Sequence, residues 1–172
     1  MLFDFAREEH VRLFTPLGDA VMGGLSTCSL DDSGSGYALF RGIVRLERGG
    51  GFASIRSSAR PVDLSGCDGL EIRARADDRS YRIGVRMDDR FDGIVYRADL
   101  DAERGRWDTV RIPFSRLLPS FRGRSVPGAP AFDPARFTSM GFVIGDRQAG
   151  PFELALAHVA AGTWDEPAIG GV

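Results

Sequence analysis

The segment DAVMGGLS, residues 19–26, brings an aspartate, two adjacent glycines and a serine close together. Glycine pairs that follow a strand sometimes cradle a phosphate with their backbone N–H groups, usually beside a lysine. The chain contains no lysine, and the residues after Gly24 alternate as in a strand instead of opening a helix. We therefore expect Gly23 and Gly24 to form a backbone turn that needs a positive φ or a close approach, with Met22 turned into the core.

Further polar residues lie in glycine-rich or aromatic surroundings. A guanidinium fork suits planar acceptors, so the arginines among them could line a groove for an anion, a sugar or a peptide. The alternative is that they tie loops to carboxylates such as Asp19 or Asp146. We predict that Asp19 lies within contact range of Arg56 or Arg122. The candidate polar site comprises Asp19, Met22, Gly23, Gly24, Ser26, Arg56, Arg122, Arg124 and Gln148.

Residues that bind metals are scattered along the sequence. His10 and His158 are the only histidines, and neither lies near a cysteine or the other histidine. His158 continues an apolar alternation, so we expect it to face the core. The acids at 99–103 lack the glycine and the closing glutamate of a calcium loop. The segment MDDRFDG (87–93) could hold a hard cation or be a simple polar loop. We expect no metal site and no cofactor.

Catalytic patterns are equally scarce. The absence of lysine removes Schiff-base chemistry, and no GxSxG nucleophile elbow is present. A Ser-His-acid triad would have to use one of two histidines in unsuitable surroundings. Paired carboxylates cannot be identified from sequence, so a small-molecule hydrolase or lyase would require a deep pocket with two close carboxylates. The sequence therefore favours binding over catalysis, and we expect the protein not to be an enzyme.

Composition is typical of a globular protein. The chain has 172 residues, 43% of them hydrophobic, and a net charge of −2. We expect one domain over residues 1–165 and a frayed tail at 166–172. The charge balance argues against nucleic-acid binding, and no apolar run approaches the ~20 residues that span a bilayer. Cys28 and Cys67 have no CxxC pattern and the N-terminus is acidic, which predicts a cytoplasmic protein with reduced thiols.

Alternation of apolar and polar residues recurs from end to end and predicts strands. Glycine- and aspartate-rich clusters separate these runs, and helix signals are confined to 7–14 and to Asp133-Pro134. Such spacing predicts an all-β fold, a sandwich or jelly roll. The predicted strands are 37–47, 70–76, 81–87, 93–100, 107–114, 137–145 and 152–159.

Several segments, in their order along about residues 3–160, resemble the signature of the thirty-kilodalton complex I intermediate-associated protein family. The matching segments are Asp19, Val21-Met22-Gly23-Gly24, Ser26, Gly50-Gly51-Phe52-Ala53-Ser54, Arg56, Trp107, Pro113-Phe114, Phe121-Arg122-Gly123-Arg124 and Gly150-Pro151-Phe152. The resemblance implies a jelly-roll β-sandwich of the galactose-binding-domain-like type.

The same resemblance implies a function. It indicates an assembly factor, or chaperone-like binding protein, for respiratory NADH–ubiquinone oxidoreductase, with complex I subunits or assembly intermediates as protein clients. The family offers no established catalytic residues. A carbohydrate-binding module is the alternative, because the expected fold is shared with sugar-binding modules and Tyr81, Tyr96, Arg82 and Arg86 are candidates for a sugar-binding surface.

Overall fold

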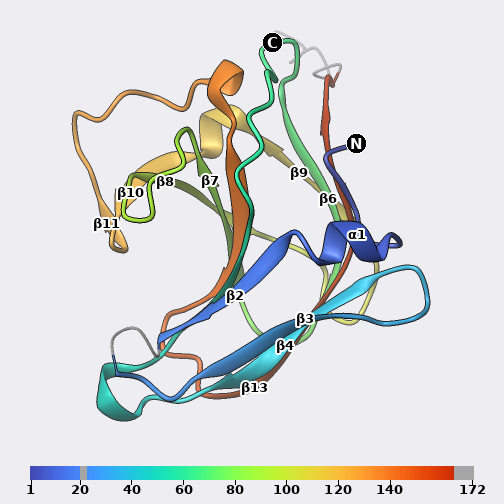
Figure 1. The fold of residues 1–172 in the computed structure, drawn as a ribbon, viewed down its shortest axis with the longest axis vertical. Coiled ribbons are helices and arrows are strands. Elements are labelled where there is room, and N and C mark those ends of the chain that lie inside the picture. The colour runs from blue at the N-terminus through green and yellow to red at the C-terminus, as the bar shows by residue number, and fades with distance from the viewer. Residues whose placement is uncertain (20–22, 165–172) are drawn as a thin grey trace, which may run out of the picture.

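The structure, a computed structural model, describes residues 1–19 and 23–164. Its strands form two antiparallel sheets that pack face to face (Figure 1). The first sheet has the order β3-β4-β13-β6-β9, and β1 pairs with β13 at its side. Its strands are β1 (Phe3–Asp4), β3 (Thr27–Asp32), β4 (Ala38–Val44), β6 (Gly69–Ala76), β9 (Asp108–Pro113) and β13 (Gly150–Gly162).

The second sheet has the order β11-β10-β8-β7-β12-β5-β2. Its strands are β2 (Phe14–Gly18), β5 (Ala53–Ser57), β7 (Tyr81–Arg86), β8 (Val95–Leu100), β10 (Leu118–Phe121), β11 (Arg124–Ser125) and β12 (Ser139–Ile144). The helical elements include the helix α1 (Glu8–Val11) and 3₁₀ turns at Glu47–Gly49, Phe114–Arg116 and Pro134–Arg136. Within the described ranges, none of these helices has the length and apolar character needed to cross a membrane.

The hydrophobic core lies between the sheets and is built by strand alternation. In β7, Ile83 and Val85 are buried, whereas Arg82 and Arg86 on the opposite face are half-buried. Each of the seven predicted runs contains a strand, and the all-β sandwich is confirmed. The short strands β2, β3, β5 and β10 were not among the predicted runs.

Two expectations about single residues are corrected by the core. Tyr81 and Tyr96, proposed for a sugar-binding surface, are only 2% and 1% exposed and point into the sandwich. Their hydroxyls donate to Asp77 Oδ1 at 2.8 Å and to the Pro130 carbonyl at 2.9 Å. Both tyrosines occupy inward positions of their strands, so neither ring offers a stacking surface.

The prediction that His158 faces the core is wrong, because a β-bulge precedes this residue in β13. The register of β13 against β6 shifts between Leu156 and His158, and His158 pairs with Arg73. A bulge sets two residues against one and so breaks the alternation on which the prediction rested. His158 is therefore half-buried and lies outside the core. The predicted helix start at Asp133 is confirmed in shorter form, because its carboxylate accepts the N–H of Ala135 at the head of a 3₁₀ turn.

Candidate functional sites

Asp19 follows β2 and its carboxylate is fully buried. Oδ1 accepts the backbone N–H of Ser26 at 2.9 Å, and Oδ2 accepts the Ser26 hydroxyl at 2.6 Å and the N–H of Gly51 at 2.8 Å. Burial alone raises the pKa of Asp19, but these hydrogen bonds outweigh it and hold the pKa below its ordinary value. We call Asp19, Gly24, Ser26, Gly50 and Gly51 the Asp19 knot.

The glycines in and next to the knot meet two different structural needs. Gly23 has φ +83° with open space around it, so its need is conformational. A Cβ placed on Gly24 would lie 2.3 Å from Cγ of Asp19, and one on Gly50 would lie 2.6 Å from Oδ2. The predicted turn with a positive φ and a close approach is therefore confirmed for Gly23 and Gly24. Met22 lies outside the described residues.

The prediction of an arginine partner for Asp19 is wrong for the part of the chain that the structure describes. The side-chain donors to its carboxylate come from Ser26, and the other donors are backbone N–H groups. Its pKa is likewise set by burial and by these donors, without a contribution from an arginine. Among the described residues, the Ser26 hydroxyl and the backbone N–H groups of Ser26 and Gly51 take the place of the expected arginine.

The remaining candidate residues are dispersed. The Gln148 side chain pairs with the backbone of Ser80, accepting its N–H at 2.8 Å and donating to its carbonyl at 2.9 Å. Arg122 donates to Asp92 at 2.5 Å, and Arg124 is exposed in β11. The β10–β11 hairpin that carries both arginines lies at one edge of the second sheet, and β2 lies at the opposite edge (Figure 1). The described members of the predicted site therefore do not gather in one place.

The Arg122-Gly123 dipeptide is a hairpin turn. Phe121 pairs with Arg124 across it, and both central residues have positive φ, +48° and +79°. Two-residue hairpin turns of type I′ require this geometry. The ion pair of Arg122 with Asp92 then fastens the hairpin to the loop between β7 and β8. Asp92 of the MDDRFDG segment is thus used by an arginine, and no three metal-binding side chains gather within residues 1–19 and 23–164.

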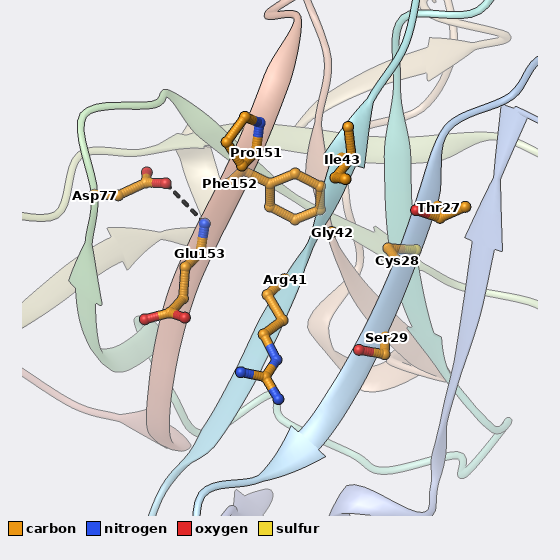
Figure 2. A pocket seen from close by; sticks show the side chains of 10 residues that line it. All are labelled: Thr27, Cys28, Ser29, Arg41, Gly42, Ile43, Asp77, Pro151, Phe152 and Glu153. Carbon is orange, nitrogen blue, oxygen red and sulfur yellow. Dashed lines mark hydrogen bonds between the residues drawn. The ribbon is translucent and has the colours of Figure 1, made fainter.

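A shallow depression of about 630 Å³ lies on the outer face of the first sheet, over β3, β4 and β13 (Figure 2). Thr27, Ser29 and Arg41 line it from β3 and β4, and Glu153 from β13. Arg41 is paired with Asp31 at 3.0 Å, and Asp77 accepts the backbone N–H of Glu153 at 2.7 Å. With its cation already paired and its walls open, the depression offers a weak contact surface.

A second, polar cavity lies where β7 begins and β8 ends. It is lined by the carboxylates of Asp99, Asp101, Glu103 and Asp146 among other residues. Arg82 bridges two of these carboxylates, with Asp99 at 3.1 Å and Asp146 at 2.7 Å. A hydrolase that uses paired carboxylates needs one free acid and one free base. Asp101 and Glu103 pair with Arg116 and Arg106 at 3.2 and 3.6 Å, so all four carboxylates are in ion pairs and this cavity supports a structural role.

A third surface lies on the outer face of the second sheet. Arg56, Gly141, Gly84 and Arg97 form one row across β5, β12, β7 and β8, since each pairs in register with the next. Arg86 lies on the same face of β7, in register with Ser139. We call Arg56, Arg86 and Arg97, with Gly84 and Gly141, the arginine face. Arg97 was missed by the sequence analysis; the available signal was a single glycine inside each of two predicted strands, Gly84 in β7 and Gly141 in β12.

Comparisons with known proteins agree with the fold and identify a family. The family model of complex I intermediate-associated protein 30 matches residues 3–156. The mitochondrial protein of that name from Drosophila melanogaster is 29% identical over 92% of this chain and 61% of its own length. Its counterpart from Neurospora crassa is 26% identical over 98% and 75%. This chain thus spans about three fifths of the Drosophila relative.

Among solved structures, the family 11 carbohydrate-binding module of a Clostridium thermocellum cellulase superposes with a TM-score of 0.69. Sequence identity is 15%, and the match covers 98% of this chain and 96% of that module. At this identity the likeness establishes the galactose-binding-like sandwich and carries no ligand with it. The family match over residues 3–156 is decisive for identity: the chain belongs to the complex I intermediate-associated protein 30 (CIA30) family.

Proposed function

We propose that this chain is a non-catalytic binding module that acts in the assembly of respiratory complex I, where it holds a subunit or an assembly intermediate. The observation that supports this most is the extent of the family match, which takes in nearly all of the described sandwich. A whole-domain match makes the sandwich itself the element shared with the named assembly proteins. Because the Drosophila relative is longer than the match, functions of its remaining length are outside this proposal.

The features that best suit a protein client are three exposed apolar side chains near the arginine face, carried by the β7–β8 loop and by β10. Phe91, Leu118 and Phe121, which we call the apolar rim, are 71%, 65% and 38% exposed. The Arg122–Asp92 ion pair brings the β7–β8 loop against the β10–β11 hairpin, and Arg122 stacks over Phe121 at 5.2 Å. Aromatic residues and arginine are enriched at protein interfaces, so this surface supports client binding.

Gene deletion in the native organism, followed by native gel electrophoresis of the respiratory complexes, tests the proposal. We expect mature complex I to fall and subassemblies to accumulate, with rescue by the wild-type gene. A Phe91→Ser/Leu118→Ser double variant should fold but fail to rescue. Ile43→Ser, which alters a 41% exposed side chain on the other sheet, is the matched control and should rescue. Normal complex I levels after deletion would refute the proposal.

Carbohydrate binding is the second candidate, because one half-buried aromatic pair favours it. Tyr37 and Trp107 meet edge to face at 5.2 Å, and Arg75 lies 5.1 Å from the centre of the Trp107 ring. Sugar rings stack on such surfaces, although the arginine already covers part of this one. Calorimetric titration with soluble β-glucan oligosaccharides tests the idea. Heat that Trp107→Ala abolishes would support it, and no heat with the wild type would exclude these sugars.

Location is a further part of the proposal. We infer a cytoplasmic protein from the reduced character expected of Cys28 and Cys67, whereas the eukaryotic relatives are named as mitochondrial. Fractionation of native cells with an antibody against the chain decides this. Recovery with the soluble fraction supports the proposal, and recovery in an organelle or tightly bound to membranes contradicts it.

A further inference from the structure

The arginine face gathers three positive side chains with little to neutralise them. Arg56, Arg86 and Arg97 are all half-buried, and the ion pairs of the described residues include none of them. Arg82, on the same face, is by contrast bound to both Asp99 and Asp146. Arg82 is therefore neutralised by two carboxylates, whereas the guanidinium groups of the arginine face have no carboxylate bound to them among the described residues.

The atomic detail points in the same direction. Arg56 Nη2 donates to the carbonyl of Arg90 at 3.2 Å, which is its one side-chain hydrogen bond in the described structure. Arg86 Nη1 is buried and has no hydrogen-bond partner among the described residues. A buried donor of a charged group that lacks a partner is costly, and such groups in native proteins usually serve a ligand, a water or an ion. Arg86 is the centre of the surface.

The pKa values of these arginines indicate that their charged forms are destabilised where they lie. Burial lowers the pKa of Arg86; Arg56 and Arg97 lower it further, and Asp88 and Asp92 raise it. Burial is also the main cause that lowers the pKa of Arg97. Arginine does not lose its proton in proteins, so the cost persists as a repulsion that an anion would relieve.

Local charge indicates which anion fits. Asp92 is occupied by Arg122, which leaves Asp88 as the carboxylate acting on both Arg56 and Arg86. Asp146 also acts on Arg97, although Arg82 already binds it. The three arginines without ion pairs outnumber Asp88, so the local charge is positive and suits a phosphate anion. Guanidinium forks bind phosphate oxygens in pairs. Gly84 and Gly141 contribute no side chains between Arg56 and Arg97, although the Val95 side chain reaches over Gly84.

The geometry points to a phosphate-binding site formed by Arg56, Arg86 and Arg97 on the outer face of the second sheet. Its ligand is the phosphate group of a small soluble molecule. An extended polyanion fits poorly, because Asp99 and Asp146 lie on the same face next to the arginines and the whole chain carries a net charge of −2. The site goes beyond the proposed assembly role and does not depend on it.

Thermal unfolding with inorganic phosphate, at constant ionic strength against chloride, tests the site in the whole chain. We expect phosphate to raise the Tm of the wild type along a saturable curve. Arg86→Gln should weaken phosphate binding by about tenfold or more, since it removes a charge-assisted contact. Without phosphate, this variant should be as stable as the wild type or more so, because the unpartnered buried donor is gone. Arg41→Gln, an exposed and paired arginine on the other sheet, should bind as the wild type does.

Each outcome decides the matter. Saturable binding that Arg86→Gln and Arg97→Gln both weaken, with folded variants verified by circular dichroism, supports the site. A phosphate effect that is equal in all variants, or absent from the wild type, overturns it. Preferential binding of a glutamate-rich peptide over phosphate also overturns it, because the face would then serve an acidic protein segment. Loss of complex I assembly can be scored separately, so failure here leaves the proposed function intact.

Discussion

The carboxylate of Asp19 and the backbone N–H of Gly51 lie 2.8 Å apart, although 32 positions separate them in the chain. Ser26 binds the same carboxylate through its N–H and its hydroxyl. The contact joins the end of β2, the approach to β3 and the turn before β5, which belong to both sheets. Two family-signature segments, DAVMGGLS and GGFAS, thus meet in one structural tie across the edge of the sandwich.

Asp19→Asn should destabilise the fold. The amide keeps one acceptor oxygen and presents an N–H₂ group where a carboxylate oxygen now accepts from Ser26 or Gly51. Leaving buried donors unsatisfied costs about 1–3 kcal/mol each, so we expect a loss of about 2–3 kcal/mol in the free energy of unfolding. Urea denaturation monitored by tryptophan fluorescence measures it. Asp31→Asn, at an exposed ion pair, is the control and should cost under about 1 kcal/mol.

Acid should weaken the Asp19 knot in a defined direction. The pKa of Asp19 is held below its unfolded value of 3.8. A depressed folded-state pKa contributes stability that is complete above the unfolded pKa and is lost as the pH falls through the folded pKa. The stability difference between wild type and Asp19→Asn should therefore be constant above about pH 5 and should shrink at lower pH. A difference that grows on acidification would contradict the assignment.

The glycines of the opening segment should respond differently to alanine. Gly24→Ala places a Cβ 2.3 Å from the Asp19 carboxyl carbon, and overpacking of this kind costs about 1–3 kcal/mol or more. Gly23→Ala meets open space and should lose about 1–2 kcal/mol through its positive φ alone. Gly66→Ala, which meets open space without a positive φ, should be neutral or slightly stabilising. Denaturation midpoints rank the three variants, and equal losses at Gly24 and Gly66 would refute the close approach.

Much of the fold could be predicted from sequence because strand alternation is a local property. Strands such as β6 and β7 bury one face and leave the other partly exposed, so apolar and polar residues alternate along their sequence. β3 has no buried position and β10 is only four residues long, so neither carries a clear pattern. The bulge that moves His158 out of the core is equally invisible, because it depends on pairing with β6.

The candidate site was harder to predict because contacts between strands are not local. Their glycine-rich or aromatic surroundings made Asp19, Arg56 and Arg122 candidates, but the residues that they contact are set by strand register and by turn geometry. Asp19 is satisfied by backbone N–H groups, which every residue but proline carries and which leave no mark in a sequence. The arginine face exists because Arg56 and Arg97, from β5 and β8, fall in one row of the sheet. Knowing the strand order would have been necessary to find it.

The stability of a Gln148→Glu variant should depend on pH, because the Gln148 amide both donates to and accepts from the Ser80 backbone. The native Nε2 donates to the carbonyls of Ser80 and Gly145, at 2.9 and 3.0 Å, while Oε1 accepts the Ser80 N–H. A carboxylate can replace only the acceptor, and it would face two carbonyl oxygens. We expect Gln148→Glu to cost about 1–3 kcal/mol at neutral pH, more than Gln148→Ala. Below about pH 4 the glutamate is protonated and donates again, so its stability should approach or exceed that of the alanine variant. Chemical denaturation of both variants at the two pH values measures this crossover. If Gln148→Glu is less stable than Gln148→Ala by the same amount at both pH values, the side chain at position 148 does not contact Ser80.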